Sequence, residues 1–212
     1  MSELALLAFH HHLLYPAAAV TSARETFLHL LAAYSEPHRR YHTLEHIKAC
    51  LLTANALPQF HAERDRDAAL ALWWHDCVYD PMAHDNEARS AQRFAELGGH
   101  GLEPATVERV QACILATSHK ETPSGPLERY VCDVDLSVLG ATPAEYDAYV
   151  RNVRAEYPHV SHEAWRVGRS AVLHGLLARK TIYQLEDFRE VYEARARLNM
   201  LGELAELEAI HV

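Results

Sequence analysis

His75-Asp76 places an imidazole and a carboxylate side by side in an apolar run that extends from Ala68 to Tyr79. Burying two such groups costs free energy unless each finds a partner. A divalent metal ion would be a suitable partner, because it offsets the carboxylate charge and binds the neutral imidazole. A salt-bridged or hydrogen-bonded pair at a helix end would satisfy the same groups, so the dipeptide alone leaves both interpretations open.

Further residues of the metal-ligating types recur along the chain. His42 and His46 are four residues apart, so a helix that included both would present them on one face. His119 follows, and then Asp133 and Asp135, which are too close along a helix for both to face one ion comfortably. Two imidazoles and two carboxylates from three helices would hold a divalent ion with open positions. Such an ion activates water and stabilises negative charge on a phosphoryl oxygen.

Helices must position these residues, because apolar residues recur at helical spacing and no sustained alternation of period two occurs. Prolines and Gly98-Gly99 separate the periodic segments. We therefore predict an all-α fold with about eight helices, a number that allows the first two and the last two segments to merge. The segments are 3–14, 21–35, 43–57, 65–78, 85–97, 104–118, 127–139, 142–156, 162–179 and 184–208.

Size and composition narrow the possible classes of protein. A chain of 212 residues suits one domain, 1–212, in which helices at 142–208 pack on a metal-site core at about 40–140. The formal net charge of -9 argues against broad binding to nucleic acid. Four cysteines with apolar neighbours indicate reduced core thiols. Since no basic leader and no membrane-spanning run is evident, we expect a cytoplasmic protein without membrane contact.

The order of the motifs resembles the HD-domain superfamily of metal-dependent phosphohydrolases, over about Arg40 to Gly140. The chain is most similar to a group described as predicted metal-dependent phosphohydrolases. The resemblance implies a single-domain helical bundle of the HD type. It rests on four segments, Arg40-Tyr-His-Thr-Leu-Glu-His-Ile47, Trp74-His-Asp-Cys-Val-Tyr79, Asp85-Asn-Glu87 and Asp133-Val-Asp-Leu136.

The resemblance also implies a ligand set for one divalent ion, whether Mn, Mg, Zn, Ni, Co or Fe. The ligands would be His46, His75, Asp76 and one aspartate of the later pair. Comparison with a Cys-Ala-Asp-Leu-Ser type of segment favours Asp135, with Asp133 as the alternative. The additional His-His pair of clear two-metal members is missing, so one ion per chain is expected.

The same resemblance suggests two catalytic histidines. The segment around His42 is similar to that of cyclic-nucleotide phosphodiesterases, in which the first histidine protonates the leaving oxygen. His42 is therefore the candidate general acid. His119 falls where some members of the superfamily place an extra histidine that binds a second metal or the substrate phosphate.

Four other residues are candidates for substrate binding. Arg40 and Lys120 could contact a phosphate, although solvated helix ends explain them nearly as well. Asn86 and Glu87 could steer substrate or hold a water molecule, and the alternative is a helix N-terminus capped by Asp85.

We expect a phosphohydrolase in which metal-activated water attacks a phosphoester of a nucleotide or other small phosphorylated metabolite. One alternative keeps the metal and changes the reaction, as in HD-type di-iron oxygenases. The other is a metal-stapled module that binds its ligand without turnover.

Overall fold

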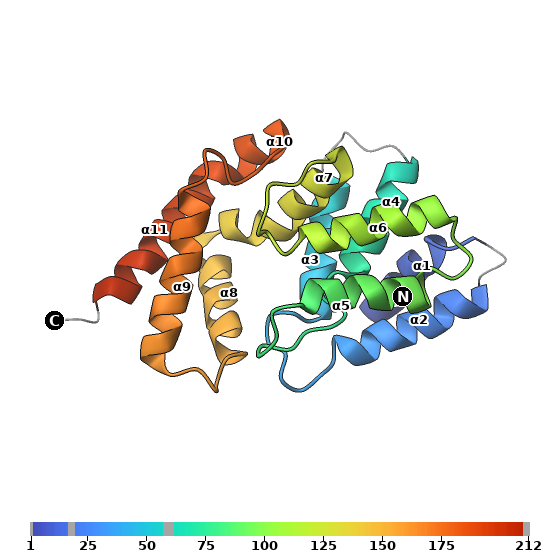
Figure 1. The fold of residues 1–212 in the computed structure, drawn as a ribbon, viewed down its shortest axis with the longest axis horizontal. Helices are drawn as coiled ribbons and strands as arrows, with labels where there is room; N and C mark the ends of the chain where they lie inside the picture. Colours follow the sequence, from blue (N-terminus) through green and yellow to red (C-terminus); the bar gives the residue numbers. More distant parts are fainter. Residues whose placement is uncertain (1, 17–19, 57–61, 210–212) are drawn as a thin grey trace. The chain divides into compact units, whose positions relative to one another are not determined.

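The computed structural model describes residues 2–16, 20–56 and 62–209, and every regular element within them is helical (Figure 1). The predicted all-α class is confirmed. None of these helices combines the length and the apolar character that crossing a membrane requires. The α-helices are α1 Glu3–Leu13, α2 Val20–Ala33, α3 Leu44–Ala56, α4 Ala62–Trp74, α5 Asn86–Arg93, α6 Pro104–Ala116, α7 Pro126–Asp135, α8 Pro143–Ala155, α9 His162–Leu177, α10 Glu186–Phe188 and α11 Ala194–Ala209.

Three short helical segments complete the described fold: the π-helices η2 (Phe94–Gly98) and η4 (Arg189–Glu193), and the 3-10 helix η3 (Leu136–Gly140). The predicted 184–208 segment is a helical run that continues through α10, η4 and α11. The predicted 65–78 segment ends earlier, at Trp74. Residue 57, the last of the predicted 43–57 segment, lies outside the described residues. The count of about eight is wrong, because the first two segments remain separate helices and so do the last two, which leaves about ten.

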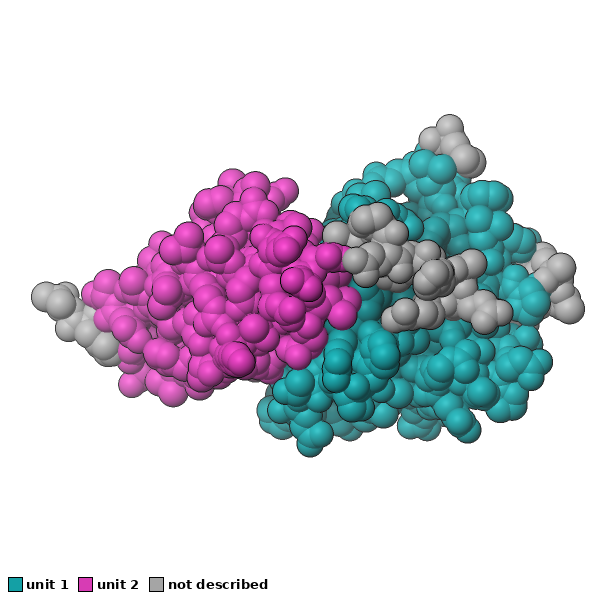
Figure 2. Space-filling model, turned by 90° about the horizontal axis from the view of Figure 1, so that it is seen from above, with its two compact units in different colours: residues 1–135 teal, residues 136–212 magenta. Residues whose placement is uncertain are grey.

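The chain divides into two compact units, Met1–Asp135 and Leu136–Val212, which Figure 2 shows in different colours. The boundary falls close to the predicted end of the metal-site core, at about residue 140. That the helices at 142–208 pack on this core stays a prediction.

The core of unit 1 is built around α4. Leu70, Leu72, Trp73 and Trp74 in the C-terminal half of this helix are completely buried, as expected for a helical segment that is apolar on all sides. α4 packs against α3, α6 and α7. At Gly98 an added Cβ would come within 2.6 Å of the Trp74 ring, so only glycine allows this close approach. α4 is therefore held in one position, and with it the residues that follow Trp74.

Unit 2 contains a buried ion pair between α9 and α11. Arg169 on α9 donates through Nε to Glu203 Oε1 at 2.7 Å and through Nη2 to Glu203 Oε2 at 3.0 Å. Tyr146 on α8 donates its hydroxyl to the same carboxylate. A buried charge pair is tolerated when both groups are well hydrogen-bonded, so this network links three helices of the unit.

Candidate metal centre

Three separate segments of unit 1 bring four candidate ligands together. His46 lies in the first turn of α3, and His75-Asp76 follows directly after the last residue of α4. Asp135 is the final residue of α7. His46 and His75 are buried, whereas the side chains of Asp76 and Asp135 keep 18% and 16% of their surface exposed. The site is thus largely desolvated, with the carboxylates on its accessible side.

The distances between the donor atoms are those of ligands around one ion. His46 Nε2 lies 3.2 Å from His75 Nε2, 3.6 Å from Asp76 Oδ2 and 3.2 Å from Asp135 Oδ1. His75 Nε2 lies 3.0 Å from Asp76 Oδ2 and 3.4 Å from Asp135 Oδ1. Nitrogen or oxygen donors about 2.0–2.1 Å from a shared ion would lie roughly 2.9–3.4 Å apart. Four of the five separations lie in this range and the fifth, from His46 Nε2 to Asp76 Oδ2, exceeds it slightly, so the arrangement fits a divalent metal ion.

A backbone contact orients the His75 ring. His75 Nδ1 lies 2.9 Å from the carbonyl oxygen of Leu72, one turn earlier in α4. A carbonyl oxygen only accepts hydrogen bonds, so Nδ1 must carry a proton and donate it. The neutral ring then presents a lone pair on Nε2, the atom that faces the other three candidate ligands. Metal-ligating histidines are commonly held in this way.

The charges of the cluster depend on one another. Burial alone would raise the pKa of Asp76 and of Asp135, but the neighbouring His75 lowers both pKa values. Burial would likewise lower the pKa of His75, whereas Asp76 and Asp135 raise that pKa well above its ordinary value. Without a metal, a proton on His75 therefore compensates the two carboxylates. A divalent cation could replace that proton and face the same two carboxylates.

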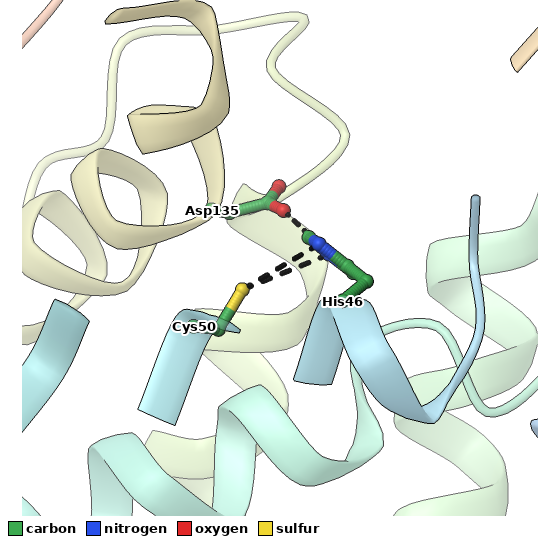
Figure 3. Close-up of side chains that lie close together, drawn as sticks. All are labelled: His46, Cys50 and Asp135. Atoms are coloured by element: carbon green, nitrogen blue, oxygen red, sulfur yellow. Dashed lines mark hydrogen bonds and ion pairs between the residues drawn. The ribbon is translucent and has the colours of Figure 1, made fainter. Parts of the chain in front are cut away.

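Cys50 adds a sulfur atom next to this cluster. It lies four residues after His46 on the same face of α3, and its Sγ is 3.7 Å from both ring nitrogens of His46 (Figure 3). His46, Cys50 and Asp135 form one group that could hold a metal ion, and His46, His75 and Asp76 form another. The sequence prediction treated Cys50 as a core thiol only. The spacing of four residues from His46 was the signal that could have connected the two.

The two predicted catalytic histidines lie close to candidate ligands. His42 precedes α3, so the helix does not include both His42 and His46, yet their ring centroids are 6.2 Å apart. The His42 ring stacks on Tyr79 at 4.0 Å. His119 Nε2 lies 2.9 Å from Asp135 Oδ2, the oxygen that does not face His46.

His119 also has an unusual backbone conformation. Its φ is 53°, the only positive value among the described residues other than glycine. This left-handed conformation is uncommon for residues with a side chain, and such strain concentrates at functional sites. The turn after α6 therefore places the His119 side chain against Asp135 at an energetic cost.

Three of the four predicted substrate-binding residues make side-chain hydrogen bonds within the protein. Arg40 Nη1 donates to the carbonyl oxygens of Pro37 and Arg39, and Lys120 Nζ donates to the carbonyl oxygen of His84. Their contact with substrate stays a prediction.

The other two candidates lie at the start of α5. Asn86 holds the loop before this helix, since its amide donates to Asp80 O at 2.9 Å and its Oδ1 accepts from Asp80 N at 3.0 Å. Glu87 is in the first turn, as the capping alternative expected, but Asp85 makes no side-chain cap. A role in substrate binding stays a prediction for both.

Asp133, the alternative ligand, is buried within α7 and belongs to neither of the two groups of the described residues that could hold a metal. Asp135 belongs to one of them and lies within 3.4 Å of two imidazoles. The geometry therefore favours the same aspartate that the resemblance favours.

Comparison of the chain with protein-family models, with curated proteins and with solved structures gives no match. The chain is an all-helical protein with buried histidine and aspartate groups that could hold a metal ion, and no family is assigned.

Proposed function

We propose that this protein is a metal-dependent phosphoric ester hydrolase of the HD type, acting on a small phosphorylated molecule. The observation that carries the proposal is the convergence of four donor atoms from three segments, in which each imidazole nitrogen lies 3.0–3.6 Å from the other imidazole and from both carboxylates. A coordinated divalent ion lowers the pKa of water and offsets negative charge on phosphoryl oxygens. His46, His75, Asp76 and Asp135 would hold that ion.

In this proposal, His42 supplies the proton that the leaving group needs. Water gives up one proton to solvent as it forms a bond to phosphorus, the bond from phosphorus to the leaving oxygen breaks, and a proton from His42 goes to that oxygen. Stacking on Tyr79 restricts the orientation of the His42 ring. Asp135 orients His119 through its second oxygen, so His119 can hold a phosphoryl oxygen or supply the proton instead of His42.

The test uses protein purified without a chelating tag and loaded with Mn, Mg, Co, Ni, Zn or Fe in turn. We expect metal-dependent hydrolysis within a panel of p-nitrophenyl phosphoesters and nucleotides. His75→Ala and Asp76→Ala should lose both bound metal and turnover. His174→Ala is the matched control, because His174 is an exposed histidine of unit 2 that is paired with Glu208.

Other outcomes would point elsewhere. Metal-loaded protein that is inert on the whole panel would count against hydrolysis. Two irons per chain with consumption of dioxygen would favour the oxygenase alternative. Tight binding of a nucleotide that raises the melting temperature without product would favour a binding module.

A further inference from the structure

Arg39 is a buried cation that neither the ligand set nor the proposed chemistry uses. Its side chain has no exposed surface, although a guanidinium remains charged at any ordinary pH. Burial of such a charge is tolerated only when its donors are matched by acceptors. Arg39 Nε donates to Glu36 Oε2 at 2.9 Å, and the other hydrogen bonds of the guanidinium go to backbone carbonyl oxygens.

Those carbonyl groups belong to the two segments that carry the site. Arg39 Nη1 donates to Asp76 O at 2.7 Å and to His42 O at 3.1 Å, and Nη2 donates to Cys77 O at 3.3 Å. Asp76 and Cys77 follow the C-terminus of α4, where a cation is favoured by the partial negative charge of the helix end. His42 precedes α3. One planar group thus ties the chain before α3 to the chain after α4.

Two aromatic rings hold the guanidinium in this orientation. Its carbon lies 5.3 Å from the ring centroid of Tyr34 and 5.4 Å from that of Tyr79, within the range of cation–π attraction. Tyr34 in turn donates its hydroxyl to Trp73 O in α4 at 2.8 Å. Tyr79 is also the ring on which His42 stacks. Displacement of Arg39 would therefore disturb both the backbone and the ring support of His42.

We propose that Arg39 is a positioning residue, which fixes His42 relative to the His75-Asp76 turn. The effect on turnover rests on the proposed function, in which His42 supplies a proton to the leaving group. It differs from the sequence expectation that an arginine in this segment could bind substrate phosphate, because no part of the Arg39 side chain is exposed. Lysine cannot substitute, since an ammonium lacks the planar fork that reaches three carbonyl groups and lies between two rings.

The experiment compares Arg39→Lys with Arg197→Lys, a matched control. Arg197 in unit 2 also donates to backbone carbonyl groups near a helix C-terminus, Leu177 O at the end of α9 and Arg179 O beyond it, and to Glu193, but 30% of its side chain is exposed. Ring-proton chemical shifts of His42 report its position, because stacking on Tyr79 places it in the ring current. These shifts are measured in chelator-treated protein, so they depend on neither metal nor turnover.

We expect Arg39→Lys to lose the ring-current shift of His42 and to lower kcat by about tenfold or more. KM and metal affinity should change less than about threefold, because the metal ligands and the substrate contacts are not altered. Arg197→Lys should retain both the shift and kcat. A wild-type His42 shift in Arg39→Lys would overturn the proposal, as would an equal change in both variants.

Two complications have defined outcomes. If wild-type protein turns over no substrate with any metal, the proposed function fails, while the His42 shift still decides the role of Arg39. If Arg39→Lys does not fold, Arg39→Ala is refolded with millimolar methylguanidinium or, separately, methylammonium. Recovery of the His42 shift with methylguanidinium alone supports the proposal, and recovery with both or with neither overturns it.

Discussion

The charge coupling within the cluster predicts that the stability of the metal-free protein depends on pH and that a bound metal removes this dependence. In the folded state the pKa of His75 is raised well above the value of about 6.5 that applies to the unfolded chain. The stabilisation from its proton is therefore complete below about pH 6.5 and is lost as pH rises through the folded pKa. Within that window the free energy of unfolding should fall by about 1.4 kcal/mol per pH unit.

The other buried side chains with shifted pKa values titrate outside the range from pH 7 to pH 8. Asp76 and Asp135 have lowered pKa values, so they contribute stability above about pH 4 and lose it only as pH falls through their folded pKa. Burial lowers the pKa of His11 to about 3, which affects stability only below about pH 6.5. Burial raises the pKa of Cys77 to about 12, and a thiol with a raised pKa affects the pH dependence of stability only above about pH 8.5.

A bound divalent ion should remove this dependence. The ion needs the neutral ring of His75, so its binding releases a proton and its affinity should rise by up to about tenfold per pH unit. Free metal at about 100 times its Kd adds about 2.7 kcal/mol to the free energy of unfolding, which raises the melting temperature by roughly 5–10 °C for a chain of this size. The metal-free protein should melt about 3–5 °C lower at pH 8 than at pH 7, whereas the metal-loaded protein should change little.

Thermal unfolding followed by circular dichroism, with chelator and with Mn, measures both the pH dependence of stability and the stabilisation by metal. His75→Gln should lose the pH dependence and the stabilisation by metal. His174→Gln should keep both, because His174 is exposed in unit 2. The reasoning is refuted if the melting temperature of chelator-treated wild type is constant or rises from pH 7 to pH 8, or if the decrease persists in His75→Gln.

Three further substitutions test separate parts of the structure. Asp135→Asn should weaken metal binding by more than about 100-fold, because loss of an outer-shell partner already costs about 10–100-fold and loss of a direct ligand should cost more. Competition with a chelating dye measures this affinity, and a value close to that of wild type would contradict the prediction. His42→Ala should keep one ion per chain and lower turnover by about 10²–10⁴-fold, so unchanged steady-state rates would remove His42 from the mechanism. Arg169→Met leaves Glu203 buried without its cation and should lower the free energy of unfolding by about 3–5 kcal/mol in urea titrations, with recovery in the Arg169→Met, Glu203→Leu double variant.

The helical class and most helix positions follow from local features of the sequence. Apolar spacing and proline breaks involve only residues that are close in sequence. The helices α6, α8 and α9 accordingly begin within one residue of the predicted positions. The end of α4 was the main exception. The apolar run continues past Trp74, but the chain turns at His75-Asp76, where Arg39 contacts the carbonyl groups that follow the helix.

Residue types and spacing alone indicated which side chains could bind a metal, because imidazole and carboxylate groups in apolar surroundings need a partner. Only the tertiary structure decided that His46, His75, Asp76 and Asp135 meet, since their separation in sequence says nothing about distance in space. It also decided the orientation of the His75 ring, the strained turn at His119 and the burial of Arg39. Each of these depends on backbone atoms of another turn or segment, and backbone atoms are the same for every residue type, so no sequence pattern records them.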